Sequence, residues 1–405
     1  MTRVARRREQ GEEERTTYLE LFFDLVFVFA VTQVSHLLLN DLSLTGALHA
    51  GMALLVVWWA WNYTTWVTNV LDPERVVVRV LLLGLTLLSL LLAVAIPEAF
   101  HGRAWLFAGA YVGIQLGRQG FLAFVASERG TVGRAANVRI VCWFVLAAPL
   151  WLAGAAAHGH VRVALWLAAL AADYCAPLLL YRVPGLPLVP HTAWDVDPAH
   201  FAERFQLFVI IALGESIVLT GATTADLHLG TARTGAFLLA FVITACLWWL
   251  YFDYAGRIAQ RRLELAPNRT IIARDAYTYL HAVLIAGIIV TAVGAELVIA
   301  HPGDRLGARE LVAVSAGPAL YLLAHTLFRL RLAGSLPPKR VAAGLACIGA
   351  GMLGDVVPAI AVSGLIAGVL VTLVVAERVA GIRRERRGEP SPLERLEQAA
   401  AAGRL

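Results

Sequence analysis

Residues 18–36 read YLELFFDLVFVFAVTQVSH, and this stretch decides the fold class of the chain. It is apolar over almost its whole length, and about 20 such residues in a helix cross the hydrocarbon core of a bilayer. It nevertheless carries Glu20 and Asp24. A charged group at bilayer depth costs about 2.5–3.5 kcal/mol even on lenient insertion scales. The stretch therefore reads as a membrane span whose two carboxylates need specific partners.

The whole chain has the composition of a membrane protein. Of its 405 residues, 59% are hydrophobic and only 16% are charged, so apolar runs recur with no room for a soluble domain between them. We predict an all-α, polytopic transmembrane helix bundle of about 12 helices, in which the short span 339–354 either crosses fully or is re-entrant. The candidate spans are 18–38, 44–67, 76–96, 104–126, 135–156, 162–182, 200–221, 233–254, 274–299, 309–330, 339–354 and 356–377.

The basic residues indicate how these spans are oriented. With the N-terminus inside and strict alternation, 29 of the 34 Lys and Arg residues fall on the inner side. Such a bias predicts that both termini are cytoplasmic. The net charge of +5 is then an orientation signal, and the expected partner is the lipid bilayer with no nucleic acid. The outer residues are Arg103, Arg162, Arg233, Arg305 and Arg309.

Two alignments within the chain suggest an internal repeat. Placing Glu20 on Glu203 pairs ELFFDLVFVFA with ERFQLFVIIAL, and placing Trp58 on Trp248 pairs WWAWNY with WWLYFD in the next span. We predict two six-helix halves in parallel orientation, related by an axis along the membrane normal.

The predicted parts follow from this repeat and from the composition of the remaining segments. Residues 183–199 are rich in Pro and acidic residues, which is typical of a linker. The C-terminal tail is either a solvated basic tail or an interfacial helix. The parts are a cytoplasmic basic tail at 1–17, halves at 18–182 and 200–380, the cytoplasmic linker at 183–199, and a cytoplasmic tail at 381–405.

Glu20 and Asp24 are one helical turn apart and therefore share a face. One interpretation is a cation or proton site, because two carboxylates that cannot both ionise cheaply can hold and release a proton. The other is structural. In that case Glu20 reaches the interface, and Asp24 fastens its helix to an arginine or a tryptophan indole of a neighbouring helix.

The stretch 200–221, HFAERFQLFVIIALGESIVLTG, is the predicted counterpart of the first span. His200, Glu203 and Arg204 form a polar cap at its inner end, where Arg204 can neutralise Glu203, Glu20 or Asp24. Glu215 lies about 18 Å further along the helix than Glu203. At that depth it either lines an aqueous cavity or substrate path, or is a capped structural acid.

Other polar residues inside the spans have less specific signals. Asp173 and His281 are expected to face the bundle interior, whereas Arg118 sits at an inner helix end where its side chain can snorkel to water. Tryptophans gather in WWAWNYTTW and WWLYFDY, and we expect an interfacial belt there rather than a ligand cage. The four cysteines lie far apart in apolar runs and are expected only to pack.

Sequence motifs for catalysis are missing. The chain has no P-loop, HExxH, GxSxG, dinucleotide fingerprint or intramembrane metal triad. We therefore expect no enzyme activity, no cofactor and no metal site.

Together, ELFFDLVFVFAVTQVSH and HFAERFQLFVIIALGES resemble the bacterial low temperature requirement A (LtrA) family, over roughly residues 16–380. The tryptophan-rich second and eighth spans are similar to it as well. Gln206 departs from the pattern, because a small residue is expected after ERF, and this puts the packing of that helix in doubt. The resemblance implies a multi-pass protein of the bacterial inner (plasma) membrane whose name refers to growth at low temperature, and it implies no settled biochemical activity.

Our leading hypothesis is a proton- or ion-coupled transporter or permease of an unknown small solute. The alternative is a non-transporting structural or partner-assembly protein in which the same charges form structural pairs. The residues assigned to the candidate ion, proton or substrate path are Glu20, Asp24, Asp173, His200, Glu203, Arg204, Glu215 and His281.

Overall fold

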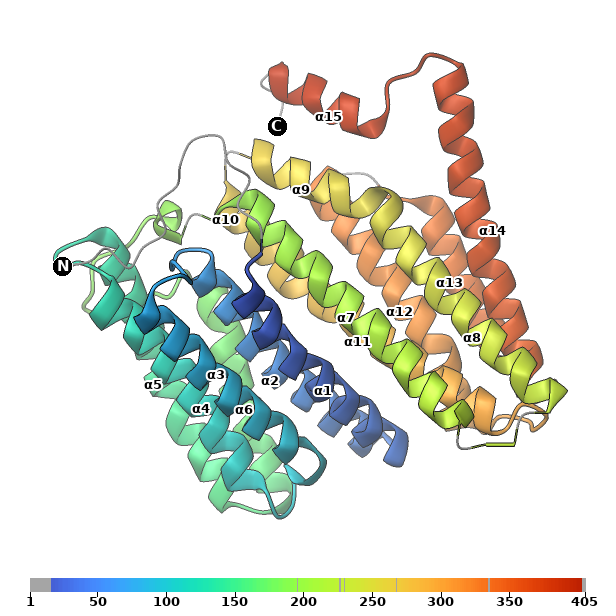
Figure 1. Cartoon of the computed structure of the whole chain (residues 1–405), viewed down its shortest axis with the longest axis horizontal. Helices are drawn as coiled ribbons and strands as arrows, with labels where there is room; N and C mark the ends of the chain where they lie inside the picture. The colour runs from blue at the N-terminus through green and yellow to red at the C-terminus, as the bar shows by residue number, and fades with distance from the viewer. Residues whose placement is uncertain are drawn as a thin grey trace. The chain divides into compact units, whose positions relative to one another are not determined.

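The computed structural model describes residues 16–194, 196–225, 227–228, 230–266, 268–333 and 336–402. Within these ranges the chain is built of helices joined by turns, and ten helices are long and apolar enough to cross a membrane (Figure 1). The predicted all-α, polytopic bundle is confirmed.

The helices follow the predicted spans closely. The first six are α1 (Tyr18–Asn40), α2 (Leu44–Thr68), α3 (Val76–Ala95), α4 (Ala104–Phe121), α5 (Val132–Ala156) and α6 (Gly159–Leu178). The others are α7 (Pro198–Ala225), α8 (Thr231–Leu250), α9 (Gly256–Leu265), α10 (Arg269–Ile272), α11 (His281–Ala300), α12 (Ala308–Ala333), α13 (Pro338–Gly351), α14 (Ala359–Arg386) and α15 (Pro392–Ala401). Short π-helical segments, Tyr251–Ala255 and Ala273–Leu280, continue α8 into α9 and α10 into α11.

Two of the twelve predicted spans fall outside the ten candidate membrane helices, namely α4 and α13. Helix α4 carries Gln115, Arg118 and Gln119, which make it more polar than its neighbours. Helix α13 has 14 residues and so rises about 21 Å, short of the roughly 30 Å hydrocarbon core. That length favours the re-entrant alternative for 339–354.

The described chain divides into two compact units. The first comprises the described part of Met1–Leu37 together with Thr45–Arg204, and the second comprises Leu38–Leu44 and Phe205–Leu405 as far as it is described. The boundary lies inside α7, directly after Arg204. The inner end of α7 therefore belongs to the first unit.

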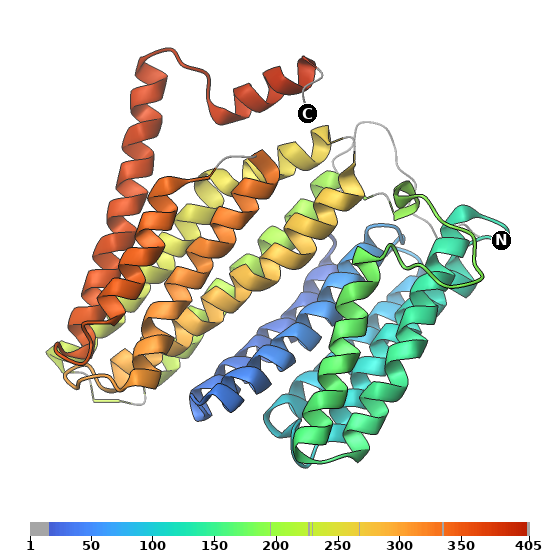
Figure 2. The same ribbon diagram turned by 180° about the vertical axis from the view of Figure 1, so that it is seen from behind.

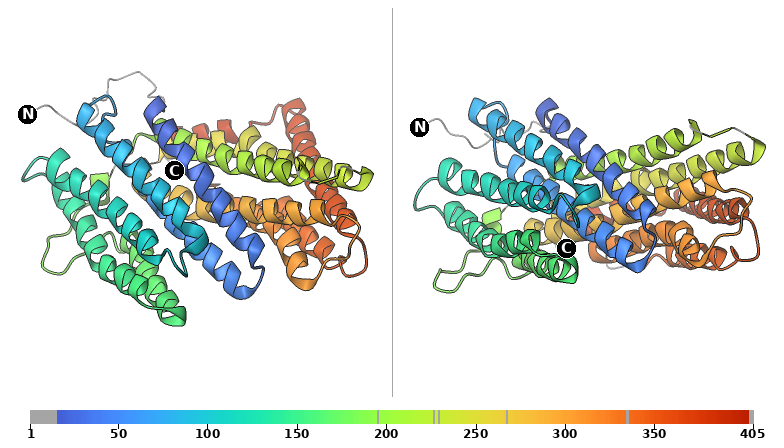
Figure 3. Two further views of the ribbon diagram at one scale, coloured as in Figure 1. Left: turned by 60° about the horizontal axis from the view of Figure 1, so that its bottom comes forward. Right: turned by 90° about the horizontal axis from the view of Figure 1, so that it is seen from below.

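In the first unit α3, α4, α5 and α6 pack as successive neighbours. Each is joined to the next by a short connection, the arrangement that makes adjacent helices antiparallel (Figure 3). Gly154 of α5 permits one close approach, because a Cβ there would lie 2.4 Å from the Trp166 indole of α6. The Trp166 indole nitrogen donates to the carbonyl of Trp151 across the same contact, at 3.0 Å.

The tryptophans of the second span correct the predicted interfacial belt. Trp58, Trp59 and Trp61 of α2 are fully buried within the protein, whereas Trp248 and Trp249 of α8 are 46% and 42% exposed. Helix α2 is buried over most of its length, which leaves these indoles packed against protein. The belt prediction was wrong for α2.

In the second unit α11 and α12 approach closely through glycines, and α13 and α14 follow as successive neighbours (Figure 2). A Cβ on Gly287 would lie 2.6 Å from the backbone nitrogen of Tyr321, and one on Gly317 would lie 2.4 Å from that of Thr291. Small residues at such contacts let two helix backbones approach closely. In a bilayer the hydrophobic effect does not drive helices together, so they associate through close packing of this kind. At the end of the chain, α15 contacts α9 through the Arg261–Glu397 ion pair.

Candidate functional site

The candidate site begins with the way α1 starts. The sequence Thr17-Tyr18-Leu19-Glu20 forms a capping box: the backbone nitrogen of Thr17 donates to Glu20 Oε2 at 2.9 Å, and that of Glu20 donates to Thr17 Oγ1 at 3.4 Å. Oxygen Oε2 also accepts from the Thr17 hydroxyl. One oxygen of Glu20 thus closes the helix end, and Oε1 is left to face other groups.

Helix α7 starts in a comparable way. Asp197 precedes it and accepts a hydrogen bond from the backbone nitrogen of His200 at 2.9 Å, and Pro198 occupies the first helical position. This start fixes His200 and Arg204 on one face, one turn apart. The amino end of a helix carries a partial positive charge, so the amino ends of α1 and α7 both favour a carboxylate nearby.

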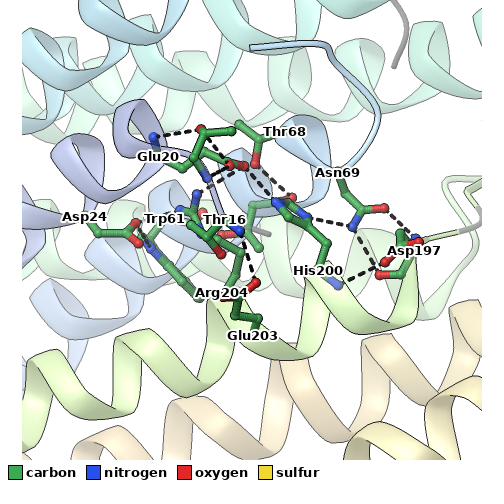
Figure 4. A network of polar contacts seen from close by, with 12 residues as sticks. Thr16, Glu20, Asp24, Trp61, Thr68, Asn69, Asp197, His200, Glu203 and Arg204 are labelled. Carbon is green, nitrogen blue, oxygen red and sulfur yellow. Dashed lines mark hydrogen bonds and ion pairs between the residues drawn. The ribbon is translucent and has the colours of Figure 1, made fainter. Parts of the chain in front are cut away.

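Arg204 connects the two carboxylates of α1 (Figure 4). Its Nη2 lies 2.6 Å from Asp24 Oδ1, and its Nη1 lies 3.3 Å from Glu20 Oε1. All three side chains are buried, with exposed fractions of 0–1%. Because water is excluded here, the guanidinium is the principal compensation for both negative charges.

Asp24 also has a neutral partner. The indole nitrogen of Trp61 in α2 donates to Asp24 Oδ1 at 2.8 Å, so this oxygen accepts from an arginine and a tryptophan together. The structural interpretation predicted an arginine or an indole for Asp24, and the structure contains both contacts.

His200 completes the cluster, and Asn69 defines its protonation. The backbone nitrogen of Asp197 donates to Asn69 Oδ1 at 2.7 Å, which orients the amide so that its Nδ2 faces His200 Nδ1 at 3.1 Å (Figure 4). Since Nδ2 is a donor, Nδ1 must be the acceptor. The ring proton then lies on Nε2, which is 3.0 Å from Glu20 Oε1, and the imidazole is neutral.

Two carboxylates of this cluster face one guanidinium. Glu20 and Asp24 contribute two potential negative charges, Arg204 contributes one positive charge, and neutral His200 contributes none. An excess negative charge in a buried setting is expensive and is relieved by taking up a proton or a cation. We call Glu20, Asp24, His200 and Arg204 the charge cluster.

The other predicted site residues lie outside the charge cluster. Glu203 faces Thr16, whose backbone nitrogen donates to it at 3.0 Å. Asp173 accepts from Tyr111 at 2.9 Å and from Trp151 at 3.3 Å in the first unit.

Glu215 and His281 both belong to the second unit. Glu215 is buried on α7, 11 residues beyond Arg204 and therefore about 16 Å along the helix. His281 Nε2 lies 2.9 Å from the Tyr251 hydroxyl. The burial expected for Asp173 and His281 is confirmed.

Sequence reasoning missed the residues that hold the cluster in place, namely Thr17, Trp61, Asn69 and Asp197. Two of them had a local signal. The Thr17-x-x-Glu20 spacing is a capping-box pattern, and Asp197 before Pro198 is a helix-start pattern. Trp61 and Asn69 had none, because their contacts join residues 37 and 131 positions apart. Among the described residues, no group of three or more His, Cys, Asp or Glu side chains is placed to hold a metal ion.

Comparison with known proteins identifies the family. The model of the bacterial low temperature requirement A protein (LtrA) matches residues 15–375. The chain belongs to the LtrA family. It is similar to the uncharacterized protein RA0937 of Rhizobium meliloti (strain 1021), with 35% identity over 376 residues that cover 92% of this chain and 91% of the relative. No solved structure matches the chain significantly.

In this LtrA chain, the two stretches that carry the family resemblance are the ones that build the charge cluster. The segment beginning at Glu20 supplies both carboxylates, and the segment beginning at His200 supplies the imidazole and the guanidinium. The family match includes both of them and ends before α15.

The cap of α7 can be tested directly. Replacing Asp197 with Ala should lower the free energy of unfolding by about 1 kcal/mol, because the backbone nitrogen of His200 loses its acceptor. Asp197→Ser keeps a capping oxygen and should retain most of the stability. The measurement is the unfolding midpoint of the purified protein in detergent. Equal midpoints for the two variants would show that the cap contributes nothing.

Proposed function

We propose that this protein is a transporter-like protein of the bacterial inner membrane, with both termini cytoplasmic, that couples protonation of the charge cluster to movement of a small solute or ion. The observation that carries the proposal is the burial of two carboxylates, Glu20 and Asp24, around one guanidinium, that of Arg204. Two buried carboxylates share one guanidinium, and the orientation of Asn69 keeps His200 neutral. A site of this kind can take up a proton or a monovalent cation and release it.

Asp24 is the residue that we assign to this uptake. Glu20 is committed to the amino end of α1 through its capping box, so a change in its charge would disturb the helix start. Asp24 does not cap a helix. Its Oδ1 is held by Arg204 and Trp61, and its Oδ2 has no hydrogen-bond partner among the described residues. A proton on Oδ2 would leave both existing contacts in place.

The predicted internal repeat is part of the same proposal. Packing within the units supports it: α3 to α6 are successive neighbours in the first unit, and α11 to α14 are successive neighbours in the second. Under the repeat, α1 corresponds to α7, so a proton-binding helix in one half has a counterpart carrying Glu215 in the other. We propose that the two halves act together in transport and that the protein does not catalyse a reaction.

A second candidate function is supported by the completeness of the local contacts. The capping box, the Arg204 ion pairs and the Trp61 hydrogen bond give the cluster a structural role in joining α1, α2 and the start of α7. In that case the protein is a non-transporting membrane protein that supports assembly or envelope structure. The two candidates differ in what happens when Asp24 loses its charge.

The deciding experiment measures decay of an imposed pH gradient in proteoliposomes with an entrapped pH-sensitive dye. Sodium, potassium and a panel of small solutes are added in turn. Wild-type protein is expected to speed the decay with at least one of them. Asp24→Asn is expected to reduce that rate at least about tenfold, because positioned proton-transferring groups contribute about 10²–10⁴-fold. Glu215→Gln tests the counterpart helix in the same assay.

The matched control is Glu128→Gln, which removes a carboxylate from an exposed loop. It should leave the rate unchanged. Wild-type protein that behaves like empty liposomes with every solute, or an Asp24→Asn variant that keeps the wild-type rate, would overturn proton coupling through Asp24. Normal folding of Asp24→Asn is checked by its unfolding midpoint.

A further inference from the structure

A second buried cation lies in the first unit, at Arg118 of α4. Its side chain is 0% exposed, which corrects the expectation that it snorkels to water from the helix end. Nη1 donates to the Ala60 carbonyl at 3.1 Å and to the Thr64 hydroxyl at 3.2 Å, both on α2, and Nη2 donates to the amide oxygen of Gln115. Arg118 therefore faces α2 across the interior of the unit.

These contacts leave the guanidinium incompletely satisfied. A guanidinium has five N–H donors, and the three contacts above use three of them. Nitrogen Nε has no hydrogen-bond partner among the described residues, and no carboxylate of that part of the chain lies within ion-pair distance of Arg118. Two donors are thus unused by these contacts, and the positive charge has no carboxylate in direct contact among the described residues.

Three other buried arginines have different partners. Arg204 pairs with two carboxylates, and Arg340 forms a two-pronged pair with Glu377 at 2.8 and 2.9 Å. Arg162 has no carboxylate, but each of its three nitrogens donates to backbone carbonyls. Arg118 differs from Arg204 and Arg340 because its hydrogen-bond partners are neutral, and from Arg162 because its Nε has no hydrogen-bond partner among the described residues.

Aromatic rings line the Arg118 guanidinium. The guanidinium carbon lies 5.1 Å from the centre of the Tyr63 ring and 5.9 Å from that of Phe144. The faces of aromatic rings attract a cation, yet they do not neutralise it. Asp173 acts on Arg118 from beyond ion-pair distance and is itself held by the Tyr111 hydroxyl and the Trp151 indole.

We propose that Arg118 is the centre of a binding site for a small monocarboxylate anion inside the first unit. A carboxylate offers two oxygens in one plane, which match a pair of guanidinium N–H donors, and brings a negative charge into direct contact with the guanidinium, which Asp173 does not do. The rings of Tyr63 and Phe144 favour a small, flat anion. The site is separate from the charge cluster, and binding there does not depend on the protein being a transporter.

The test is ligand-dependent thermal unfolding of the full-length protein in detergent, with sodium acetate, sodium benzoate or sodium chloride at equal ionic strength. A ligand that binds only the folded state raises its midpoint. Acetate or benzoate should raise the wild-type midpoint saturably by about 2 °C or more, and chloride should not. Equal shifts with chloride, or no saturable shift with either carboxylate, would overturn the proposal.

Two variants separate binding from general destabilisation. Gln115→Glu places a carboxylate beside Arg118 as an internal ligand, so it should fold normally and lose the response to added carboxylates. Gln119→Glu is the matched control: it adds the same charge on the same helix, at a buried amide that pairs with Asn137. It should keep the response even if its midpoint falls. A Gln115→Glu variant that responds like wild type would contradict the assignment to Arg118.

Discussion

Replacing Arg204 with Gln should be the most damaging single change in the charge cluster, lowering the free energy of unfolding by about 3–5 kcal/mol. The side chain is fully buried and lies 2.6 Å from Asp24 and 3.3 Å from Glu20. Its loss leaves two carboxylates in a protein interior without their cation, and the remaining partners, Trp61 and His200, are neutral. The measurement is the denaturant and thermal midpoint of purified protein in detergent.

The matched control for this change is Arg331→Gln. Arg331 also pairs with an aspartate, at 2.8 Å, but its side chain is 40% exposed. Water can replace the lost contact there, so the expected cost is about 0–1 kcal/mol. The double variant Asp24→Asn with Arg204→Gln should recover part of the stability lost in Arg204→Gln, because one of the two unpaired charges is gone. Similar midpoints for Arg204→Gln and Arg331→Gln would refute the assigned role of Arg204.

Gly317→Ala should have the second largest effect, even though it adds one methyl group. The new carbon would lie 2.4 Å from the backbone nitrogen of Thr291 in α11. A backbone atom cannot relieve this overlap by a change of rotamer, as a side chain can. Helices α11 and α12 would have to separate, at an expected cost of about 1–3 kcal/mol. The unfolding midpoint of the purified variant measures this cost.

Gly368→Ala in α14 is the matched control for the glycine contact. No heavy atom lies within 4 Å of the added carbon, so the methyl group meets no neighbour. Alanine favours a helix over glycine by about 0.8–1.0 kcal/mol, and the midpoint should rise or stay unchanged. Opposite signs for the two substitutions are the expected result. A fall at both positions would indicate that helix contacts are not the cause.

The sequence identified the right charged residues and left their partners open. Arg204 was a candidate partner for Glu203, Glu20 or Asp24, and the structure pairs it with the latter two. Glu203 instead accepts from the backbone of Thr16. The choice depends on how α1 and the first turns of α7 are rotated about their axes within the first unit. Periodicity shows on which face of its own helix a residue lies. It does not show which face of a neighbouring helix packs against that residue.

Errors of the sequence-based interpretation share one cause. Arg118 and the α2 tryptophans were placed at the membrane boundary because they lie near the ends of apolar runs, and both are buried. An arginine stem or an indole is amphipathic and suits either environment. Hydropathy cannot distinguish a span that faces lipid from one that is surrounded by other helices.

The sequence by itself determined that this LtrA chain is a bundle of membrane helices with carboxylates that demand partners. That much is local, since the cost of placing each residue in a bilayer depends mainly on its own side chain and its neighbours along the helix. Only the tertiary structure decided that Arg204 joins Glu20 to Asp24, that Asn69 sets the proton of His200, and that Arg118 has no carboxylate in direct contact among the described residues. Those facts rest on contacts between residues as far as 180 positions apart, and helix packing alone brings them together.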